Sequence, residues 1–200
     1  MVHLTRIYTR FGDQGECMLG DGSTVSKTSA RVGAYGAVDE ANAAVGLAVC
    51  EAEAFGTPAM HAIAEELRGV QQDLFDVGAD LCTPIVPQEK PGQRLRVAAS
   101  QTDRLEAMID RHNAGLAALR SFVLPGGTRL AAALHLARTT ARRAEREAVM
   151  LMNAEPDATN RAALIYLNRL SDLLFVLSRV ANDHGKGDVL WTPGVNRGTA

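Results

Sequence analysis

Apolar residues recur at alternating spacings of three and four along five stretches of the chain, a pattern that is typical of amphipathic helices rather than strands. The stretches cover about residues 29–53, 57–81, 99–119 and 161–182, with a further one around residues 134–151. The seam of the second stretch is unbroken and consists of Ile63, Leu67, Val70, Leu74, Val77 and Leu81. The pattern therefore predicts five helices whose apolar faces pack together.

Non-helical segments separate the predicted helices. We expect Thr57-Pro58 to begin the second helix and Thr128 to cap the fourth after the Gly126-Gly127 turn. Residues 83–97 contain three prolines and a glycine, which predicts a long loop with either a functional role or mobility. The tail from residue 185 is again rich in glycine, and we expect Trp191 to dock it.

The composition narrows the fold class. Hydrophobic residues make up 46% of the 200 residues and aromatic ones only 4%, and the dominance of Ala and Leu favours closely packed helices. A chain of this length fits a single domain. We therefore predict one all-α domain with a glycine-rich arm over residues 1–28, a helical bundle over 29–184 and a tail over 185–200.

Charge and cysteine usage exclude several classes of protein. A net charge of −2 argues against a nucleic-acid partner, which would require a basic excess. No run of eighteen apolar residues occurs, so no membrane span is predicted. Cys17, Cys50 and Cys82 are odd in number and widely spaced, which indicates neither a disulfide framework nor a zinc site. We expect a reducing, cytoplasmic setting.

Residues 6–28 are too rich in turn-forming residues for a helix, and we interpret them as a loop. The segment Thr9-Arg10-Phe11-Gly12-Asp13-Gln14-Gly15, with Lys27 further on, combines free backbone N–H groups with a hydroxyl and two cations. Glycine-rich backbone can form a concave site for anions. The alternative is a flexible arm, because the G-x-x-x-x-G-K-[ST] pattern of a Walker loop is absent.

A second candidate site lies on the fourth helix. At about 100° of turn per residue, Arg138, Arg142 and Glu145 fall within roughly 60° of one another, beside the apolar seam. Two guanidiniums and a carboxylate suit a phosphate chain, with Mg²⁺ held through its oxygens. The alternative is a set of surface ion pairs along the helix.

Three further features stand out. We expect Asp39, on the first helix, to pair with an arginine, either Arg138 or Arg142, the alternative being a solvated carboxylate such as we expect for Glu40 beside it. Phe122 and Val123 are unusually apolar for a surface loop, and we expect the bundle to cover them, the alternatives being a second subunit or a ligand. We interpret His112 as a hydrogen-bonded core histidine.

Metal and common catalytic motifs are missing from the sequence. The five histidines are never three or four residues apart, and no Glu-x-x-His quartet occurs, which argues against a ferritin-like di-iron site. A transition metal bound by protein ligands is therefore not expected. There is neither a G-x-S-x-G elbow nor a Rossmann fingerprint. Two glycine-rich loops and an arginine-lined helix remain, which together indicate a phosphate site.

Six motifs occur in a fixed order over nearly the whole chain. They are Tyr8-Thr9-x-x-Gly12-Asp13-x-Gly15, Ser26-Lys27, Tyr35-Gly36-x-Val38-Asp39-Glu40-x-Asn42, Ser121-Phe122-x-Leu124-Pro125-Gly126-Gly127, Ala137-Arg138-x-x-x-Arg142-Arg143-Ala144-Glu145-Arg146 and Tyr166-Leu167-Asn168-Arg169-Leu170-Ser171-Asp172. From about Arg6 to Gly194 the sequence therefore resembles the PduO-type ATP:cob(I)alamin adenosyltransferases.

The resemblance implies a fold and a reaction. The expected fold is a five-helix, left-handed up-and-down bundle of the ferritin-like kind, assembled as a homotrimer with active sites between subunits. The expected reaction converts ATP and a reduced corrinoid, cob(I)alamin, into adenosylcobalamin and tripolyphosphate. A cobalamin reductase or a cobalamin-dependent mutase is the expected protein partner.

The resemblance also implies residue roles. The loop that wraps the triphosphate would consist of Thr9, Arg10, Phe11, Gly12, Asp13, Gly15, Cys17, Met18 and Lys27. The helical residues that hold ATP would be Arg142, Arg143, Glu145, Arg146 and Asn168, with Glu145 as the contact to Mg²⁺. Arg138 would pair with Asp39 across helices. Cobalamin would contact Phe122, Val123 and Phe175, and Phe122 would displace the lower axial ligand of cobalt.

Three positions depart from the family pattern. Cys17 and Met18 stand where the family commonly has Thr or Ser, so hydroxyl contacts to phosphate are not expected there, whereas backbone contacts to phosphate can persist. Ala141 replaces a frequent Cys, a packing change that we expect to be silent. The rival interpretations of the whole chain are a non-catalytic nucleotide- or corrinoid-binding carrier and a phosphotransferase that releases ADP.

Overall fold

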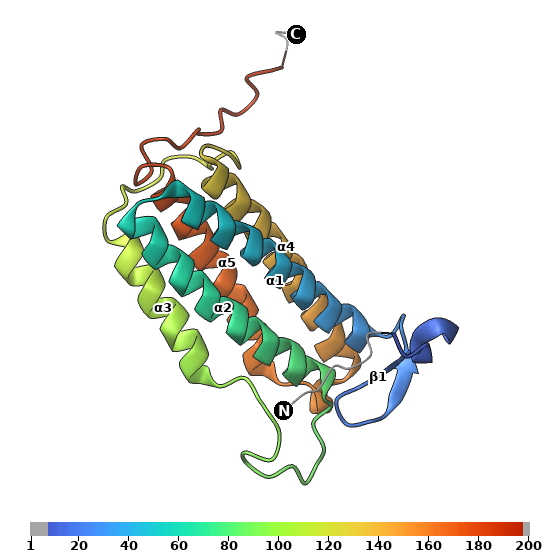
Figure 1. Ribbon diagram of the computed structural model, residues 1–200. Coiled ribbons are helices and arrows are strands. Elements are labelled where there is room, and N and C mark those ends of the chain that lie inside the picture. Colours follow the sequence, from blue (N-terminus) through green and yellow to red (C-terminus); the bar gives the residue numbers. More distant parts are fainter. Residues whose placement is uncertain (1–7, 198–200) are drawn as a thin grey trace.

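The chain folds into an up-and-down bundle of five helices (Figure 1). This computed structural model describes residues 8–197. The helices are α1 (Ala30–Phe55), α2 (Pro58–Cys82), α3 (Ala99–Asn113), α4 (Arg129–Ala154) and α5 (Arg161–Ala181). The all-helical bundle predicted from the apolar periodicity is confirmed.

Helix boundaries follow local capping chemistry. The side chains of Ser29, Thr57, Thr128 and Asn160 each accept a hydrogen bond from a backbone N–H in the first turn of the helix that follows, which satisfies donors that the helix itself leaves free. The predicted starts at Thr57 and Thr128 are thereby confirmed. Helix α1 ends at Gly56, whose φ of 75° is a left-handed conformation that glycine adopts without strain.

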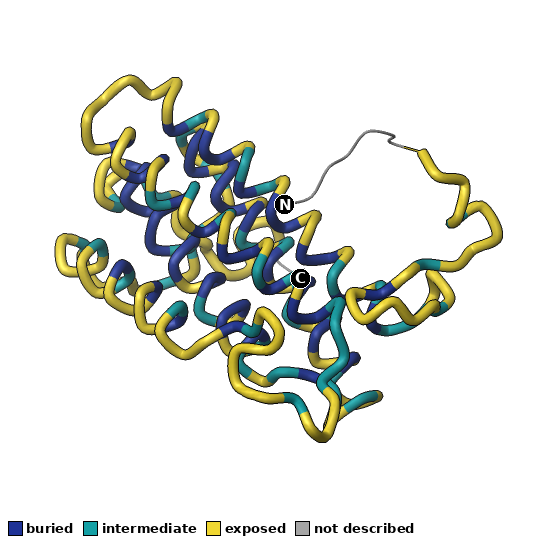
Figure 2. Tube along the Cα trace, turned by 60° about the horizontal axis from the view of Figure 1, so that its bottom comes forward, coloured by how far each residue is buried: buried dark blue, intermediate teal, exposed yellow. Residues whose placement is uncertain are grey.

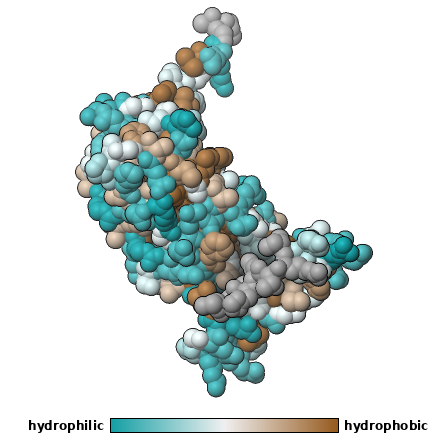
Figure 3. All heavy atoms as spheres, in the orientation of Figure 1, coloured by the Kyte–Doolittle hydropathy of each residue, from teal (hydrophilic) through white to brown (hydrophobic). Residues whose placement is uncertain are grey.

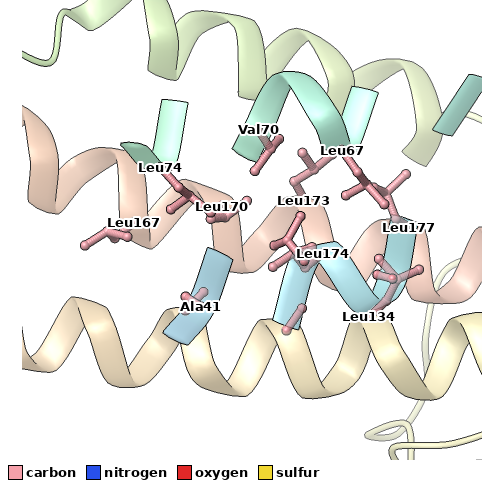
Figure 4. Close-up of a cluster of buried hydrophobic side chains, with 14 of the residues drawn as sticks. Ala41, Leu67, Val70, Leu74, Leu134, Leu167, Leu170, Leu173, Leu174 and Leu177 are labelled. Carbon is pink, nitrogen blue, oxygen red and sulfur yellow. The ribbon is translucent and has the colours of Figure 1, made fainter. Parts of the chain in front are cut away.

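The core lies between α1, α2, α4 and α5. Figure 2 shows buried residues along the inward side of each helix, and Figure 4 shows one cluster of side chains formed by leucines of α2, α4 and α5 with Ala41 of α1. Helices α1 and α4 pack on each other and are rich in buried alanines: Ala34, Ala37, Ala41, Ala48 and Ala52 on α1, and Ala131, Ala133, Ala137, Ala141, Ala144 and Ala148 on α4. Small side chains allow these two backbones to approach closely, as the alanine-rich composition predicted.

Helix α3 packs on α5, adds Leu105 and Met108 to the core, and is tied to α2 by ion pairs. His112 Nε2 lies 2.7 Å from Glu66 Oε2, and Arg111 pairs with the other oxygen of Glu66 at 2.6 Å. The interpretation of His112 as a hydrogen-bonded histidine is confirmed, but the residue is only partly buried and lies at the edge of the core. Nearer the other end of α3, Arg104 pairs with Asp73, which is also the acceptor for the buried hydroxyl of Tyr166 at 3.0 Å.

Two predictions about local structure were wrong. The third helix ends at Asn113 rather than near residue 119, because Gly115, two residues further on, is a poor helix former. Beyond it the carbonyl of Ala117 accepts a hydrogen bond from Arg179 Nη2. The stretch before residue 28 is not all loop: it contains the short helix Phe11–Gln14 and an antiparallel hairpin of β1 (Glu16–Met18) and β2 (Thr24–Ser26). Hydrogen bonds between strands hold it, and helical periodicity could not reveal them.

The long loop between α2 and α3 is held in place by a buried carboxylate. Asp80, whose side chain is 0% exposed, accepts hydrogen bonds from Arg96 Nη1 at 2.7 Å, Val97 N at 2.7 Å and Asn160 Nδ2 at 2.6 Å. These three donors occupy most of the roughly four acceptor positions of the Asp80 carboxylate. Because two of the donors belong to the loop and one to Asn160, the loop is fixed to both α2 and the start of α5. None of the helices within residues 8–197 is sufficiently long and apolar to cross a bilayer.

Candidate functional site

The glycine-rich arm forms a compact structure around Lys27. The backbone N–H of Lys27 donates to the carbonyl of Gly15 at 2.8 Å, and Gly15 has a φ of 81°. A Cβ added at Gly12 would lie only 2.8 Å from Lys27 Nζ. The absence of a side chain at Gly12 therefore leaves room for the ammonium group beside the backbone of the short helix Phe11–Gln14.

The hairpin part of the arm is docked onto the bundle. Cys17 Sγ lies 3.0 Å from Tyr35 Oη of α1, and the N–H of Gly20 donates to the carbonyl of Cys82 at 3.1 Å. Burial first, and the Cys17 thiol second, raise the pKa of Tyr35 well above its usual range. The Cys17 side chain therefore faces Tyr35, whereas Met18 is exposed. Beyond this anchor Thr9, Arg10, Phe11 and Asp13 remain exposed.

Arg142 and Arg143 face different neighbours although they are adjacent in α4. Arg143 forms an ion pair with Glu40 of α1. Arg142 is exposed and has no ion pair within residues 8–197. Its neighbour Glu145 accepts a hydrogen bond from Asn168 Nδ2 of α5 at 2.8 Å. The expectation that Glu40 is solvated is confirmed, because its side chain is 57% exposed although Arg143 pairs with it across the helix interface.

A cavity of about 470 Å³ opens near the start of α4. The residues that line it are Leu119, Ser121, Phe122, Val123, Arg138 and Phe175. Phe122 is 77% exposed, so the expectation that the bundle covers it was wrong: the loop directs this ring outward, beside the cavity. The cavity is therefore lined mostly by apolar side chains, together with the guanidinium of Arg138.

The positive charge of Arg138 has no ion-pair partner within residues 8–197. Its Nε is buried without a hydrogen-bond partner within residues 8–197. Burial first, and the charge of Arg142 second, lower the pKa of the Arg138 guanidinium. Two arginines one turn apart, neither paired with a carboxylate in this part of the chain, leave a local excess of positive charge that favours an anion.

His135, one turn before Arg138, is a buried residue packed against Phe175 of the cavity wall, and the sequence analysis did not single it out. It is 2% exposed, and both ring nitrogens lack hydrogen-bond partners within the described residues. Its ring lies edge-on to Phe175, with centroids 6.3 Å apart. Burial first, and Arg138 second, lower the pKa of the imidazole. Its position three residues before Arg138 on the same helix was the available signal.

The predicted ion pair between Asp39 and Arg138 does not form within one chain. Asp39 lines a groove between α1 and α2 together with Tyr35, Asn42 and Phe75. Arg138 lines the cavity between α4, α5 and the loop before α4. The two side chains belong to different grooves, so any contact between them must join two copies of the chain.

The structure thus groups the predicted site residues into separate clusters. Arg142, Glu145 and Asn168 lie together, and so do Arg138, Phe122, Val123 and Phe175. The arm with Lys27 is at the opposite end of the bundle from the loop that contains Phe122 (Figure 1). Within residues 8–197 no hydrogen bond or ion pair joins the arm to either cluster.

The described residues contain no group of three or more His, Cys, Asp or Glu side chains suited to a metal ion. Glu145 is the acidic residue beside Arg142, and one of its oxygens is already bonded to Asn168. A single carboxylate is compatible with Mg²⁺ that is held chiefly by phosphate oxygens and water.

Comparison with known proteins gives consistent matches over the length of the chain. A family model described as cobalamin adenosyltransferase matches residues 7–181. A corrinoid adenosyltransferase of Mycobacterium tuberculosis (strain ATCC 25618 / H37Rv) is 57% identical over 98% of this chain and 97% of that protein. One from Bacillus subtilis (strain 168) is 42% identical over 92% of this chain and 91% of that protein.

A solved structure is similar as well. A variant of the PduO-type ATP:corrinoid adenosyltransferase from Lactobacillus reuteri, complexed with cobalamin and ATP, superimposes with a TM-score of 0.82. It is 39% identical in sequence, and the match covers 94% of this chain and 97% of that one.

Proposed function

The chain belongs to the cobalamin adenosyltransferase family, and from this we infer that it is a corrinoid adenosyltransferase. It transfers the 5′-deoxyadenosyl group of ATP to the cobalt of a reduced corrinoid, and tripolyphosphate is the other product. The observation that supports this most directly is the pair of uncompensated arginines, Arg138 and Arg142, beside an apolar cavity flanked by Phe122.

The reaction sets clear demands on the protein. Co(I) attacks C5′ of the ribose, the bond between C5′ and its oxygen breaks, and the triphosphate leaves with the bonding electrons. Because cobalt is itself the nucleophile, no general base is needed. The protein must stabilise the leaving group with fixed positive charge and hold C5′ in line with cobalt.

The two α4 clusters suit these two tasks. Arg142 is exposed and unpaired, so its guanidinium is free to bind phosphate oxygens, while Asn168 holds the Glu145 carboxylate beside it at 2.8 Å. Phe122 is directed outward next to the cavity. A phenyl ring has no atom that can coordinate cobalt, so a ring placed below the corrin would exclude the lower axial ligand and make Co(II) easier to reduce.

Mg²⁺ is part of the proposal. Glu145 would hold it through one carboxylate oxygen, and the phosphates of ATP and water would supply the remaining ligands. The ion would neutralise part of the charge on the triphosphate. Lys27 and the backbone N–H groups of the arm would bind the same triphosphate from the other side.

We place each active site between two chains of a homotrimer. The arm with Lys27 and the Arg142 cluster do not meet within one chain, and neither do Asp39 and Arg138. Both faces also expose large apolar side chains: Leu47 and Phe75 on α1 and α2, and Leu136, Met150 and Ile165 on α4 and α5. Figure 3 shows brown, hydrophobic residues over the α1 and α2 face among hydrophilic ones. Apolar surface of this kind is common at subunit interfaces.

One assay tests the function against its rivals. The protein is incubated anaerobically with ATP, Mg²⁺ and chemically reduced cobalamin; the absorbance of the alkylcobalamin is followed and the phosphate product identified. Adenosylcobalamin with tripolyphosphate is expected. Release of ADP would instead indicate a phosphotransferase, and binding without turnover a carrier.

A mixing experiment tests the shared active site. Lys27→Ala and Arg142→Ala chains are each expected to be nearly inactive alone. If every site takes its arm from one chain and its α4 cluster from another, co-assembly of equal amounts restores about one quarter of the sites to wild-type composition. No recovery, with assembly confirmed by light scattering, would show that both residues act within one chain.

The cellular setting follows from the same chemistry. Cys17, Cys50 and Cys82 are all free thiols, which is compatible with the proposed reducing, cytoplasmic location. The reaction consumes a reduced corrinoid and yields adenosylcobalamin. A cobalamin reductase and an adenosylcobalamin-dependent enzyme such as a mutase are therefore the proposed partners.

A further inference from the structure

The tail after α5 is paired with the loop that presents Phe122. Val123 and Leu190 form an antiparallel β-bridge. The N–H of Trp191 donates to the carbonyl of Phe122 at 2.8 Å, and the N–H of Leu124 donates to the carbonyl of Val189 at 2.8 Å. Ser121 Oγ adds a hydrogen bond to the Trp191 carbonyl at 2.7 Å. The backbone on both sides of Val123 is therefore fixed by the tail.

The tail is itself fixed by a buried polar network at the end of α5. Arg179, 6% exposed, donates to Asp188 Oδ2 at 2.8 Å, and the Asp188 side chain is 3% exposed. Asn182 Nδ2 donates to Asp188 Oδ1 and to the carbonyl of Gly126, both at 3.2 Å. One network thus holds the base of the tail and the base of the Phe122 loop.

The ring of Phe122 contacts the tail as well. Its centroid lies 6.1 Å from that of the Trp191 ring, at an interplanar angle of 55°. Trp191 is the aromatic residue in contact with it within residues 8–197. Since Phe122 is 77% exposed, few other contacts in this part of the chain restrict its rotamers. A tilted aromatic pair at this distance is attractive.

We propose that Trp191 is a positioning residue that holds Phe122 in the orientation needed to displace the lower axial ligand of cobalt. This rests on the proposed role of Phe122. Trp191 acts only through Phe122. Loss of the ring pair frees other Phe122 rotamers and lowers the fraction of correctly placed rings about threefold or more.

The test compares four full-length variants: Trp191→Ala, Trp191→Phe, Leu190→Ala and Phe122→Ala. Leu190 is the matched control, because successive side chains of a strand point to opposite sides. Each protein is loaded with ATP, Mg²⁺ and Co(II) cobalamin, and electron paramagnetic resonance measures the fraction of cobalt without an axial nitrogen. Turnover from Co(II) and from Co(I) and the KM for ATP are measured in parallel.

For Trp191→Ala we expect that fraction, and kcat from Co(II), to fall about threefold or more, with the KM for ATP and kcat from Co(I) within about twofold of wild type. Trp191→Phe should restore most of the loss, and Leu190→Ala should match wild type. If Phe122→Ala removes the cobalt species without an axial nitrogen and Trp191→Ala leaves it unchanged, the positioning role is overturned. If Phe122→Ala also leaves it unchanged, the role of Phe122 fails with it, while turnover from Co(I) still reports on the adenosyltransferase activity.

Discussion

Adjacent arginines on α4 offer a direct test of the phosphate site. Arg142→Ala removes a guanidinium that is exposed and has no ion pair within residues 8–197. Arg143→Ala is the matched control, because it removes the same side chain from the next position, where the guanidinium is paired with Glu40. The two substitutions have equal helix propensity and change net charge equally.

From the structure we expect different losses of activity and of stability for the two variants. Removal of one preorganised donor to a developing oxyanion costs about 100- to 1,000-fold in kcat, so we expect a loss of this size in kcat/KM for ATP with Arg142→Ala. Its stability should change by less than about 0.5 kcal/mol, because no contact within the chain is lost. The Arg143–Glu40 pair has side chains 37% and 57% exposed, so Arg143→Ala should cost at most about 1 kcal/mol of stability and less than about threefold in activity.

The assay follows adenosylcobalamin formation anaerobically at several ATP concentrations, with thermal unfolding recorded by circular dichroism on the same samples. Arg142→Lys adds a further comparison, since an ammonium retains the charge but not the planar pair of donors. Equal activity losses at positions 142 and 143 would refute the argument from geometry, because net charge rather than placement would then explain both. A large activity loss only at 143 would transfer the phosphate contact to that residue.

Three other predictions concern Asp39, His135 and Phe122. Asp39→Asn should weaken assembly of the trimer but leave the dissociated chain as stable as wild type, because its proposed partner Arg138 belongs to another copy. A melting temperature of the variant that no longer depends on protein concentration would support this. A dependence unchanged from that of wild type would exclude the pair. His135→Leu should stabilise the fold by about 1–2 kcal/mol at pH 8, since it removes a buried group without partners. Burial first, and the charge of Arg138 second, lower the pKa of His135 in the folded chain, while Asp188 opposes this shift. As the pH falls below about 6.5, the unfolded chain therefore binds a proton at His135 that the folded chain does not bind. Wild type should then lose stability relative to the variant between pH 8 and 5.5, and parallel urea curves at the two pH values would contradict the lowered pKa. Phe122→Ala should slow turnover from Co(II) about tenfold and affect turnover from Co(I) less, whereas equal losses would argue against a role in displacing the axial ligand.

The sequence by itself determined the helices and most of their starts. Apolar periodicity and capping are local: the spacing of Ile63, Leu67 and Val70 and the hydroxyl of Thr128 define a helix face and a helix start from residues within a few positions of one another. The Gly12 and Lys27 motif was also local enough to predict an anion site, although not the hairpin beside it, which depends on pairing between strands.

Only the tertiary structure decided which surfaces the site residues share. The pairing of Trp191 with Phe122 joins residues about seventy positions apart, and the contact of Arg143 with Glu40 depends on how α4 is rotated against α1. The same rotation places Arg138 and Asp39 in different grooves. Periodicity gives the face of a helix but not the neighbour that it meets, because that neighbour is set by the packing of the whole bundle.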